Sequence, residues 1–165
     1  MKHLLLSIIL LSNVGCLEHS QKNKAFKPSI SQMLKRTHKA YKPTVHDYIA
    51  ISAQSFEINP QLIKAMITVE SSWRPKVISH AGAMGYMQVM PFNAKRCDLL
   101  SSDELLHPEK NIDCGTQIIA EELERFDGDL VKALQVYNGG DKCINRCTES
   151  INYSRKVLKV LALQS

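Results

Sequence analysis

The chain has 165 residues, enough for one domain with a hydrophobic core, and an ordinary globular composition of 44% hydrophobic and 22% charged residues. Its formal net charge of +5 is unevenly spread, because seven Lys and Arg residues and no acidic residue lie between His19 and His46. From Asp47 to Ser165 there are 13 basic and 15 acidic residues. This slightly acidic domain argues against a nucleic-acid-binding protein, which needs a basic patch on its folded surface.

Residues 1–16 predict an export signal. Lys2 supplies a positive start, and the apolar run from Leu4 to Leu11 is too short to span a bilayer as a helix. The ending "NVGC" resembles a bacterial lipobox, although Asn13 stands where an aliphatic residue is usual. Lipidation at Cys16 would give an outer-membrane lipoprotein, and plain signal cleavage is the alternative. Both routes lead to the periplasm or cell envelope.

The polar and basic sequence of residues 17–43 predicts a flexible arm, because few apolar residues recur at helical spacing. One frayed helix is expected near 31–40. An arm of this charge beside a membrane is attracted to anionic lipid or anionic wall polymer. A solvated linker is the alternative interpretation. The folded domain is expected to span residues 44–165.

Five helical segments and no alternating strand are expected in this domain, so the fold class is all-α. The first segment begins after Thr44, which is followed three residues later by Asp47, the spacing of a capping box. The second begins with Asn59 as the cap and Pro60 in the first helical position, and it ends before Pro75. The other three are expected at about 108–126, at 130–138 before the Gly139-Gly140 pair, and at 149–163.

Glu70 lies within the apolar arc of the second predicted helix. At about 100° per residue it falls about 20° from Ile63, on the same side as Met66 and Ile67. Removal from water would raise the pKa of its carboxyl and keep it protonated nearer neutral pH. A carboxylic acid of that kind is suited to protonating a leaving oxygen. The alternative is a buried glutamate satisfied by local hydrogen bonds.

Five cysteines are present, and setting Cys16 aside leaves four that an exported domain normally oxidises. Three pairings exist, and we favour Cys97–Cys114 and Cys143–Cys147 because each closes a local segment. A four-cysteine zinc site is the alternative. It is disfavoured because the chain has no CxxC pair and the compartment is oxidising.

Four short motifs occur in chain order: Glu70-Ser71, Gly85-Tyr86-Met87-Gln88, Val136-Tyr137-Asn138 followed by Gly139-Gly140, and Tyr153. Together they resemble the motifs of the soluble-type lytic transglycosylases, which have a goose-type-lysozyme-like fold. Tyr86 stands where leucine is usual and Val136 where alanine is usual, and both changes bear on the shape of a substrate groove. The resemblance extends over about residues 44–161.

The resemblance implies cleavage of the β-1,4 bond between N-acetylmuramic acid and N-acetylglucosamine in peptidoglycan, with a 1,6-anhydro product. Glu70 would act as general acid and then as general base. No metal or organic cofactor is implied. The resemblance also implies supporting roles. Ser71 would set the local geometry of Glu70, and Met87 would line the groove. Gln88 and Asn138 would bind sugar, and Tyr137 and Tyr153 would orient the Glu70 carboxyl.

Two other functions remain open from the sequence, a goose-type-like lysozyme and a non-catalytic wall-binding scaffold lipoprotein. The recognised motifs contain no second acid, which fits a one-carboxylate mechanism assisted by the N-acetyl group of the substrate. Expected partners are peptidoglycan strands and, through Cys16, a membrane. The small size further suggests a local task, such as opening the wall for an envelope-spanning secretion or conjugation apparatus.

Overall fold

The computed structural model describes residues 41–164, so the export signal, Cys16 and the helix expected near 31–40 lie outside the described residues. Within the described residues every named element is helical, and β structure is limited to isolated bridges, as the all-α prediction requires. None of these helices is both long and apolar enough to cross a membrane. The α-helices are α2 (Val45–Ser55), α3 (Pro60–Ser71), α4 (Pro108–Arg125), α5 (Leu130–Gly139) and α6 (Thr148–Ala162), and the 3₁₀ turns are η1 (Pro91–Asn93), η2 (Lys95–Cys97), η3 (Ser102–Leu106) and η4 (Asp141–Cys143).

The start of α2 confirms the predicted capping box. The Thr44 hydroxyl oxygen accepts from the Asp47 amide at 3.4 Å, and the Asp47 carboxylate accepts from the Thr44 amide at 2.7 Å. The Tyr41 hydroxyl donates to the same carboxylate at 2.7 Å. The last residues of the predicted arm are therefore attached to the domain.

Helix α3 begins as predicted and ends slightly earlier than Pro75 alone would require. Asn59 caps it by accepting from the Gln61 amide at 2.9 Å. After Ser71 the chain turns through left-handed backbone at Ser72, with φ 50°, and Trp73, with φ 63°. This turn leaves Glu70 as the penultimate residue of α3, in the last turn of the helix.

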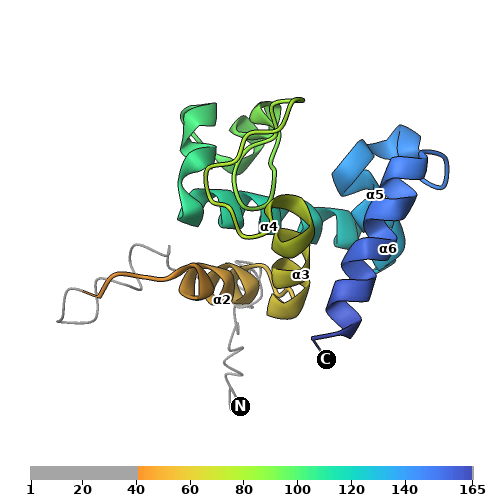
Figure 1. Ribbon diagram of the computed structural model, residues 1–165, viewed down its shortest axis with the longest axis horizontal. Helices are drawn as coiled ribbons and strands as arrows, with labels where there is room; N and C mark the ends of the chain where they lie inside the picture. Colours follow the sequence, from red (N-terminus) through yellow and green to blue (C-terminus); the bar gives the residue numbers. More distant parts are fainter. Residues whose placement is uncertain (1–40, 165) are drawn as a thin grey trace, which may run out of the picture.

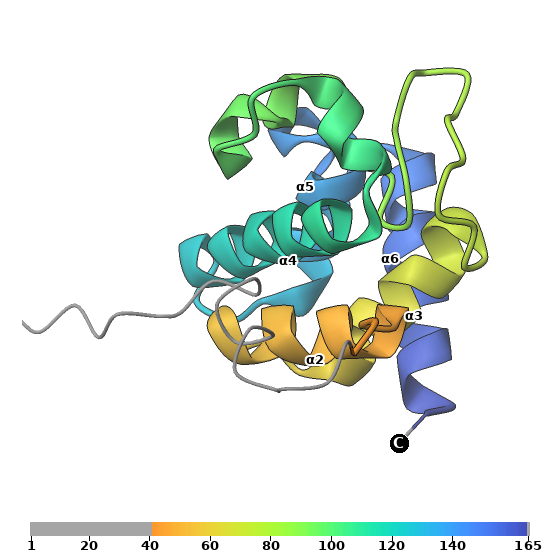
Figure 2. The ribbon, with the colours of Figure 1, turned by 90° about the vertical axis from the view of Figure 1, so that its left-hand side faces the viewer.

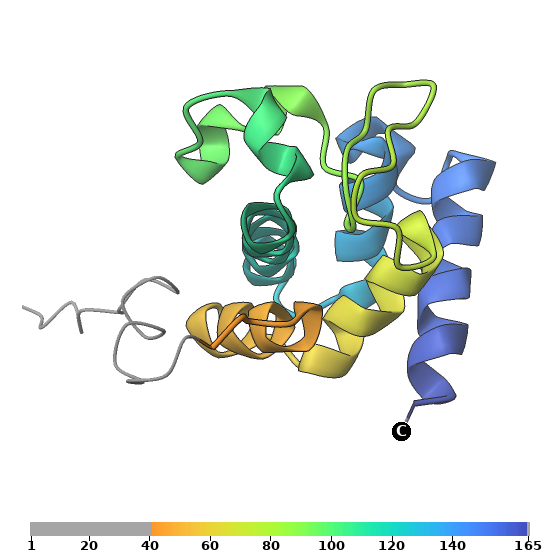
Figure 3. The same ribbon diagram turned by 60° about the vertical axis from the view of Figure 1, so that its left-hand side comes forward.

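Helix α4 lies at the centre of the fold, and Figure 3 looks nearly along its axis. It packs on α2, on α5 and on η3, while α6 packs on both α3 and α5 (Figure 1). The buried core residues of α4, such as Ile112 and Ile119, are completely shielded from water. Helix α6 therefore lies against both α3 and α5, although α3 is distant from the other two in the sequence.

A long loop connects α3 to η1 and projects beside the end of α3 before returning toward α4 (Figure 2). Met84 pairs with Ile78 and with Val89 through isolated bridges, and these pairings brace the returning segment. The same segment carries the Gly85 to Gln88 motif. The loop is therefore tied at its base, where the motif lies.

Two disulfides form, Cys97–Cys114 and Cys143–Cys147. This is the pairing favoured from the sequence. The first joins η2 to α4, and the second closes the short turn between α5 and α6. Both stabilise segments that contain little regular secondary structure by restricting the unfolded chain.

Candidate active site

Glu70 occupies a mostly apolar position at the end of α3. Its helix neighbours Ile63, Met66 and Ile67 are fully buried, whereas Glu70 keeps part of its surface open to solvent. Enough protein surrounds the carboxyl for burial to raise the pKa of Glu70 to about 7, and the nearby Tyr153 hydroxyl opposes this shift. Such a group is half protonated near neutral pH and reaches solvent, which suits proton transfer to and from a ligand.

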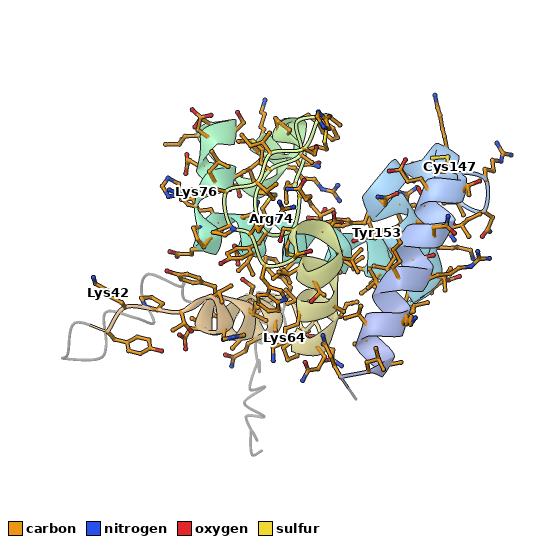
Figure 4. All side chains as sticks on the ribbon, in the orientation of Figure 1. Lys42, Lys64, Arg74, Lys76, Cys147 and Tyr153 are labelled. Atoms are coloured by element: carbon orange, nitrogen blue, oxygen red, sulfur yellow. A yellow bond between two sulfur atoms is a disulfide. The ribbon has the colours of Figure 1, made fainter. Side chains whose placement is uncertain are left out.

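Two tyrosines from the last two helices approach this carboxyl. Tyr153 lies on the side of α6 that faces α3, and only 6% of its surface is exposed (Figure 4). Its buried hydroxyl has no hydrogen-bond partner in full bonding geometry among residues 41–164. The Tyr137 hydroxyl, on α5, donates to the Met87 carbonyl at 2.8 Å. Burial, and then the negative charge of Glu70, raises the pKa of both tyrosines, so both remain proton donors at neutral pH.

Two amide side chains, Gln88 and Asn138, lie near the same site, and each keeps one polar group available to bind a ligand. Gln88 adopts left-handed backbone, with φ 49°, and its Nε2 donates to the carbonyls of Gly85 at 2.9 Å and Val77 at 3.2 Å. These bonds use both hydrogens and leave the side-chain oxygen for a ligand. The Asn138 oxygen accepts from the Ser150 hydroxyl at 2.9 Å, which leaves the Asn138 NH₂ group as a donor.

Met87 is placed differently from what the resemblance implies, whereas Ser71 lies beside Glu70 at the end of α3. The Met87 side chain is completely buried, so it packs in the core and does not line a groove. Its contribution to the site is the main-chain carbonyl that Tyr137 binds. The Ser71 hydroxyl donates to the Ile67 carbonyl within α3 at 3.2 Å, and therefore contributes to the end of the helix. There Arg74 also donates from Nε to the Ser71 carbonyl at 2.9 Å (Figure 4).

Asn111 is a site-supporting residue that the sequence analysis missed. It is completely buried on α4, where its Nδ2 donates to the carbonyls of Met84 at 2.7 Å and Leu105 at 2.8 Å. Its Oδ1 accepts from the Met87 amide at 2.8 Å. Asn111 thus fixes the main-chain amide of Met87, and Tyr137 fixes its carbonyl. The available signal was an asparagine directly before Ile112 in the apolar face of a strongly amphipathic helix.

Two glycines allow these close approaches. Gly85 has φ +76°, and a Cβ atom there would collide with the Asn111 side chain. A Cβ atom at Gly115 would lie 2.6 Å from the Met87 sulfur and 3.0 Å from the Tyr137 hydroxyl oxygen. The absence of side chains at both positions lets the loop and α5 reach α4.

A groove of about 670 Å³ adjoins this group of side chains. Its lining comes from α4, from the segment that includes η1, and from the end of α5 with the residues that follow it. The lining includes Gln88, Tyr137 and Asn138 but not Glu70. Tyr137 is the lining residue that lies close enough to the Glu70 carboxyl to be affected by its charge. Gln88, Tyr137 and Asn138 therefore line a groove with room for a ligand of several rings, and Tyr137 connects the groove to Glu70 and Tyr153.

The groove also contains charged residues that the sequence analysis did not anticipate. Arg125 binds Glu122 at 3.1 Å and Asp141 at 2.7 Å, and Arg96 binds Glu122 at 3.3 Å. Glu122 is buried between the two arginines. Because these carboxylates are already engaged, neither Glu122 nor Asp141 stands free for a second catalytic role.

The raised pKa of Glu70 predicts a pH-dependent change in stability. The ordinary pKa is 4.5 and the folded value is about 7, so the unfolded chain ionises first and stability falls as the pH rises across this interval. For a shift of this size the loss approaches about 3 kcal/mol. The Glu70→Gln substitution removes this pH-dependent loss of stability. Urea unfolding at pH 4.5 and pH 8 should show that the free energy of unfolding of the variant rises relative to that of the wild type at the higher pH. An equal difference between the two proteins at both pH values would contradict the assigned pKa.

Comparison with known proteins places the chain in a family. The sequence model of the protein family described as the transglycosylase SLT domain matches residues 47–158. The transglycosylase of Enterobacteria phage PRD1 is 36% identical over 114 residues, which cover 69% of this chain and 41% of the phage protein. The soluble lytic murein transglycosylase of Escherichia coli K12 is 34% identical over 91 residues, covering 51% of this chain and 14% of that protein.

The fold agrees with this relationship. The crystal structure of the 70 kDa soluble lytic transglycosylase from Escherichia coli matches with a TM-score of 0.63 at 27% identity, covering 70% of this chain and 23% of that chain. The complex of a 70 kDa soluble lytic transglycosylase with bulgecin A matches with a TM-score of 0.67 at 26% identity, covering 72% and 23%. The chain spans less than half the length of these relatives. Since the family match covers most of the chain, from α2 to α6, this protein belongs to the transglycosylase SLT domain family.

Proposed function

We propose that the protein is an exported lytic transglycosylase that cleaves the β-1,4 bond between N-acetylmuramic acid and N-acetylglucosamine in peptidoglycan. The observation that carries the proposal is the partly buried carboxyl of Glu70, with its pKa raised to about 7 beside two tyrosines, in a member of this family. The amides of Gln88 and Asn138 supply hydrogen bonds suited to sugar hydroxyl and N-acetyl groups.

In the proposed reaction Glu70 transfers one proton in each direction. As a general acid it protonates the glycosidic oxygen as the bond from that oxygen to C1 of muramic acid breaks. The 6-hydroxyl of the same muramic acid then attacks C1, and its proton returns to Glu70. The bond lost at C1 is replaced by the bond to O6, so no water is added and no oxidant is needed. Tyr153 orients the carboxyl while it changes charge, and Tyr137, which is bound to the Met87 carbonyl, lies beside it.

Hydrolysis by water is the nearest competing reaction at the same carbon. The tethered 6-hydroxyl has an advantage, because well-oriented intramolecular groups reach effective concentrations of about 10⁵ M or more. An inverting hydrolase would need a second carboxylate free to activate water. In the groove, Glu122 and Asp141 are bound by arginines, whereas Glu149 also lines the groove and is exposed. The intramolecular route is therefore supported by the high effective concentration of the 6-hydroxyl and not by a lack of carboxylates. A non-catalytic scaffold would have no use for the proton-transfer properties of Glu70.

Export and anchoring complete the proposal. The signal pattern and Cys16 support delivery to the cell envelope, and the basic arm supports attraction to anionic lipid or wall polymer. Among the relatives are proteins named as membrane-bound and as soluble murein transglycosylases. A local role beside an envelope-spanning secretion or conjugation apparatus belongs to the same proposal.

Mass spectrometry of the products released from purified peptidoglycan tests the reaction. We expect muropeptides with 1,6-anhydro ends, lighter by one water (about 18 Da) than hydrolysis products, because the internal hydroxyl outcompetes water. Glu70→Gln is the matched control and should release neither product. Predominantly reducing ends that depend on Glu70 would contradict transglycosylation in favour of a lysozyme. Binding to the wall without any product would favour the scaffold.

A further inference from the structure

Phe92 is an exposed aromatic residue on the wall of the groove. Its residue surface is 75% exposed, and among the large hydrophobic residues that the described part of the chain exposes, Phe92 alone lines this groove. A phenylalanine side chain carries about 150–250 Å² of surface that gains free energy when it is covered. Its position therefore points to a ligand that covers it.

The backbone beneath Phe92 is firmly held. Phe92 is the middle residue of η1, with Pro91 at its first position. The Asn93 amide donates to the Met90 carbonyl at 2.9 Å, and the amide of the buried Ala94 donates to the Pro91 carbonyl at 3.1 Å. Only the ring projects from this tied turn. Because the backbone is fixed, only the side-chain torsions of Phe92 lose freedom when a ligand stacks on the ring.

The rest of the lining indicates what kind of ligand fits. Gly139 and Gly140, both exposed, contribute no side chain to the groove, and a Cβ atom at Gly140 would meet nothing within 4 Å. The arginines of the groove are paired with acidic residues, so their charge is largely compensated within the protein. Glu149 also lines the groove, at an exposed position. The amides, the bare backbone and the one aromatic ring suit a ligand with an apolar face and polar edges.

We propose that Phe92 is a stacking platform for a pyranose ring of the glycan strand, at a sugar other than the one attacked beside Glu70. This inference rests on the proposed function for its choice of a glycan. The C–H face of a pyranose covers the ring of Phe92, while the sugar's polar edges reach groups such as Gln88 and Asn138. Phe92 lines the groove and Glu70 does not, so we place this sugar on η1 and not on the Glu70 carboxyl. Phe92 thus contributes affinity for strands long enough to reach η1.

Kinetics on purified glycan strands test the role of this ring. Phe92→Ala should raise KM about 3- to 10-fold, the worth of one aromatic contact, with a smaller effect on kcat. Phe92→Tyr should restore the wild-type KM, because the aromatic face is kept. Leu100→Ala is the matched control, since Leu100 is 97% exposed but lies outside the groove lining. An unchanged KM in Phe92→Ala, or an equal rise in Leu100→Ala, would overturn the proposal.

Binding separates a failure of this inference from a failure of the proposed reaction. In the Glu70→Gln background, sedimentation with insoluble peptidoglycan should show weaker binding when Phe92→Ala is added and no change when Leu100→Ala is added. This result would hold even if the wild-type products proved to be those of a hydrolase. Equal binding of both double variants would overturn the stacking role while leaving the Glu70 chemistry intact. A Phe92→Ala defect confined to intact cells, with normal binding of purified strands, would overturn it in favour of a protein-docking surface.

Discussion

Replacing Glu70 with glutamine is expected to reduce kcat/KM on peptidoglycan by at least about 10²- to 10⁴-fold, the usual contribution of general acid–base catalysis. The loss should be at the upper end of this range, because the same carboxyl serves both proton transfers in the proposed reaction. Glutamine has nearly the same shape but no proton to exchange at neutral pH. The fold should therefore persist, as circular dichroism can verify.

The matched control for this result is Glu109→Gln. Glu109 also lies on a helix, is also partly buried, and burial also raises the pKa of its carboxyl. It is not among the residues that line the groove. Its replacement should leave turnover within about twofold of the wild type, because Glu109 lies outside the groove and substitutions away from buried features usually change stability by only about 0.5 kcal/mol. Near wild-type cleavage by Glu70→Gln would show that the catalytic assignment is wrong.

Asn111→Ala is expected to lower the free energy of unfolding by about 3 to 5 kcal/mol. The change removes three hydrogen bonds and leaves the Leu105 carbonyl and the Met87 amide buried without their Asn111 partner, whereas the Met84 carbonyl keeps the Val89 amide at 3.0 Å. An unpaired buried polar group costs about 1–3 kcal/mol, and partial relaxation keeps the total below the sum. Urea denaturation followed by circular dichroism measures the loss.

A buried serine on α6 provides the control for Asn111. Ser154 is also buried, but its hydroxyl donates to the Ile151 carbonyl within the same helix, so Ser154→Ala should cost about 1 kcal/mol or less. Asn111→Ala should also reduce cleavage in samples that are fully folded, because the Met87 carbonyl no longer holds Tyr137 in place. A destabilisation no greater than that of Ser154→Ala would contradict the role assigned to Asn111.

The helices were largely predictable from the sequence because their signals are local. Thr44 and Asp47 form the expected capping box, Asn59 and Pro60 start α3, and α5 ends at the glycine pair. Each of these features depends on residues within one or two turns of one another. The helical period also placed Glu70 in an apolar arc, which was sufficient to single it out as a candidate acid before any tertiary contact was known.

The surroundings of Glu70 could be anticipated only by family resemblance and not by local rules. Tyr137 and Tyr153 reach its carboxyl from α5 and α6, and no periodic pattern in the sequence relates those helices to α3. Met87 was expected in the groove, yet its side chain is fully buried, because Gly115 leaves room for it against α4. The paired charges of Glu122 and Arg125 in the groove were not predicted at all.

The sequence by itself determined the helical class, the helix ends and the choice of Glu70, because capping, periodicity and proline restrictions act over a few neighbouring residues. Only the tertiary structure decided how far the pKa of Glu70 rises and which residues support it. Burial and hydrogen bonding of a carboxyl depend on the packing of segments that are far apart in the chain. Asn111 illustrates the difference: its residue type is visible in the sequence, but its three partners are set by where α4 meets two separate loops.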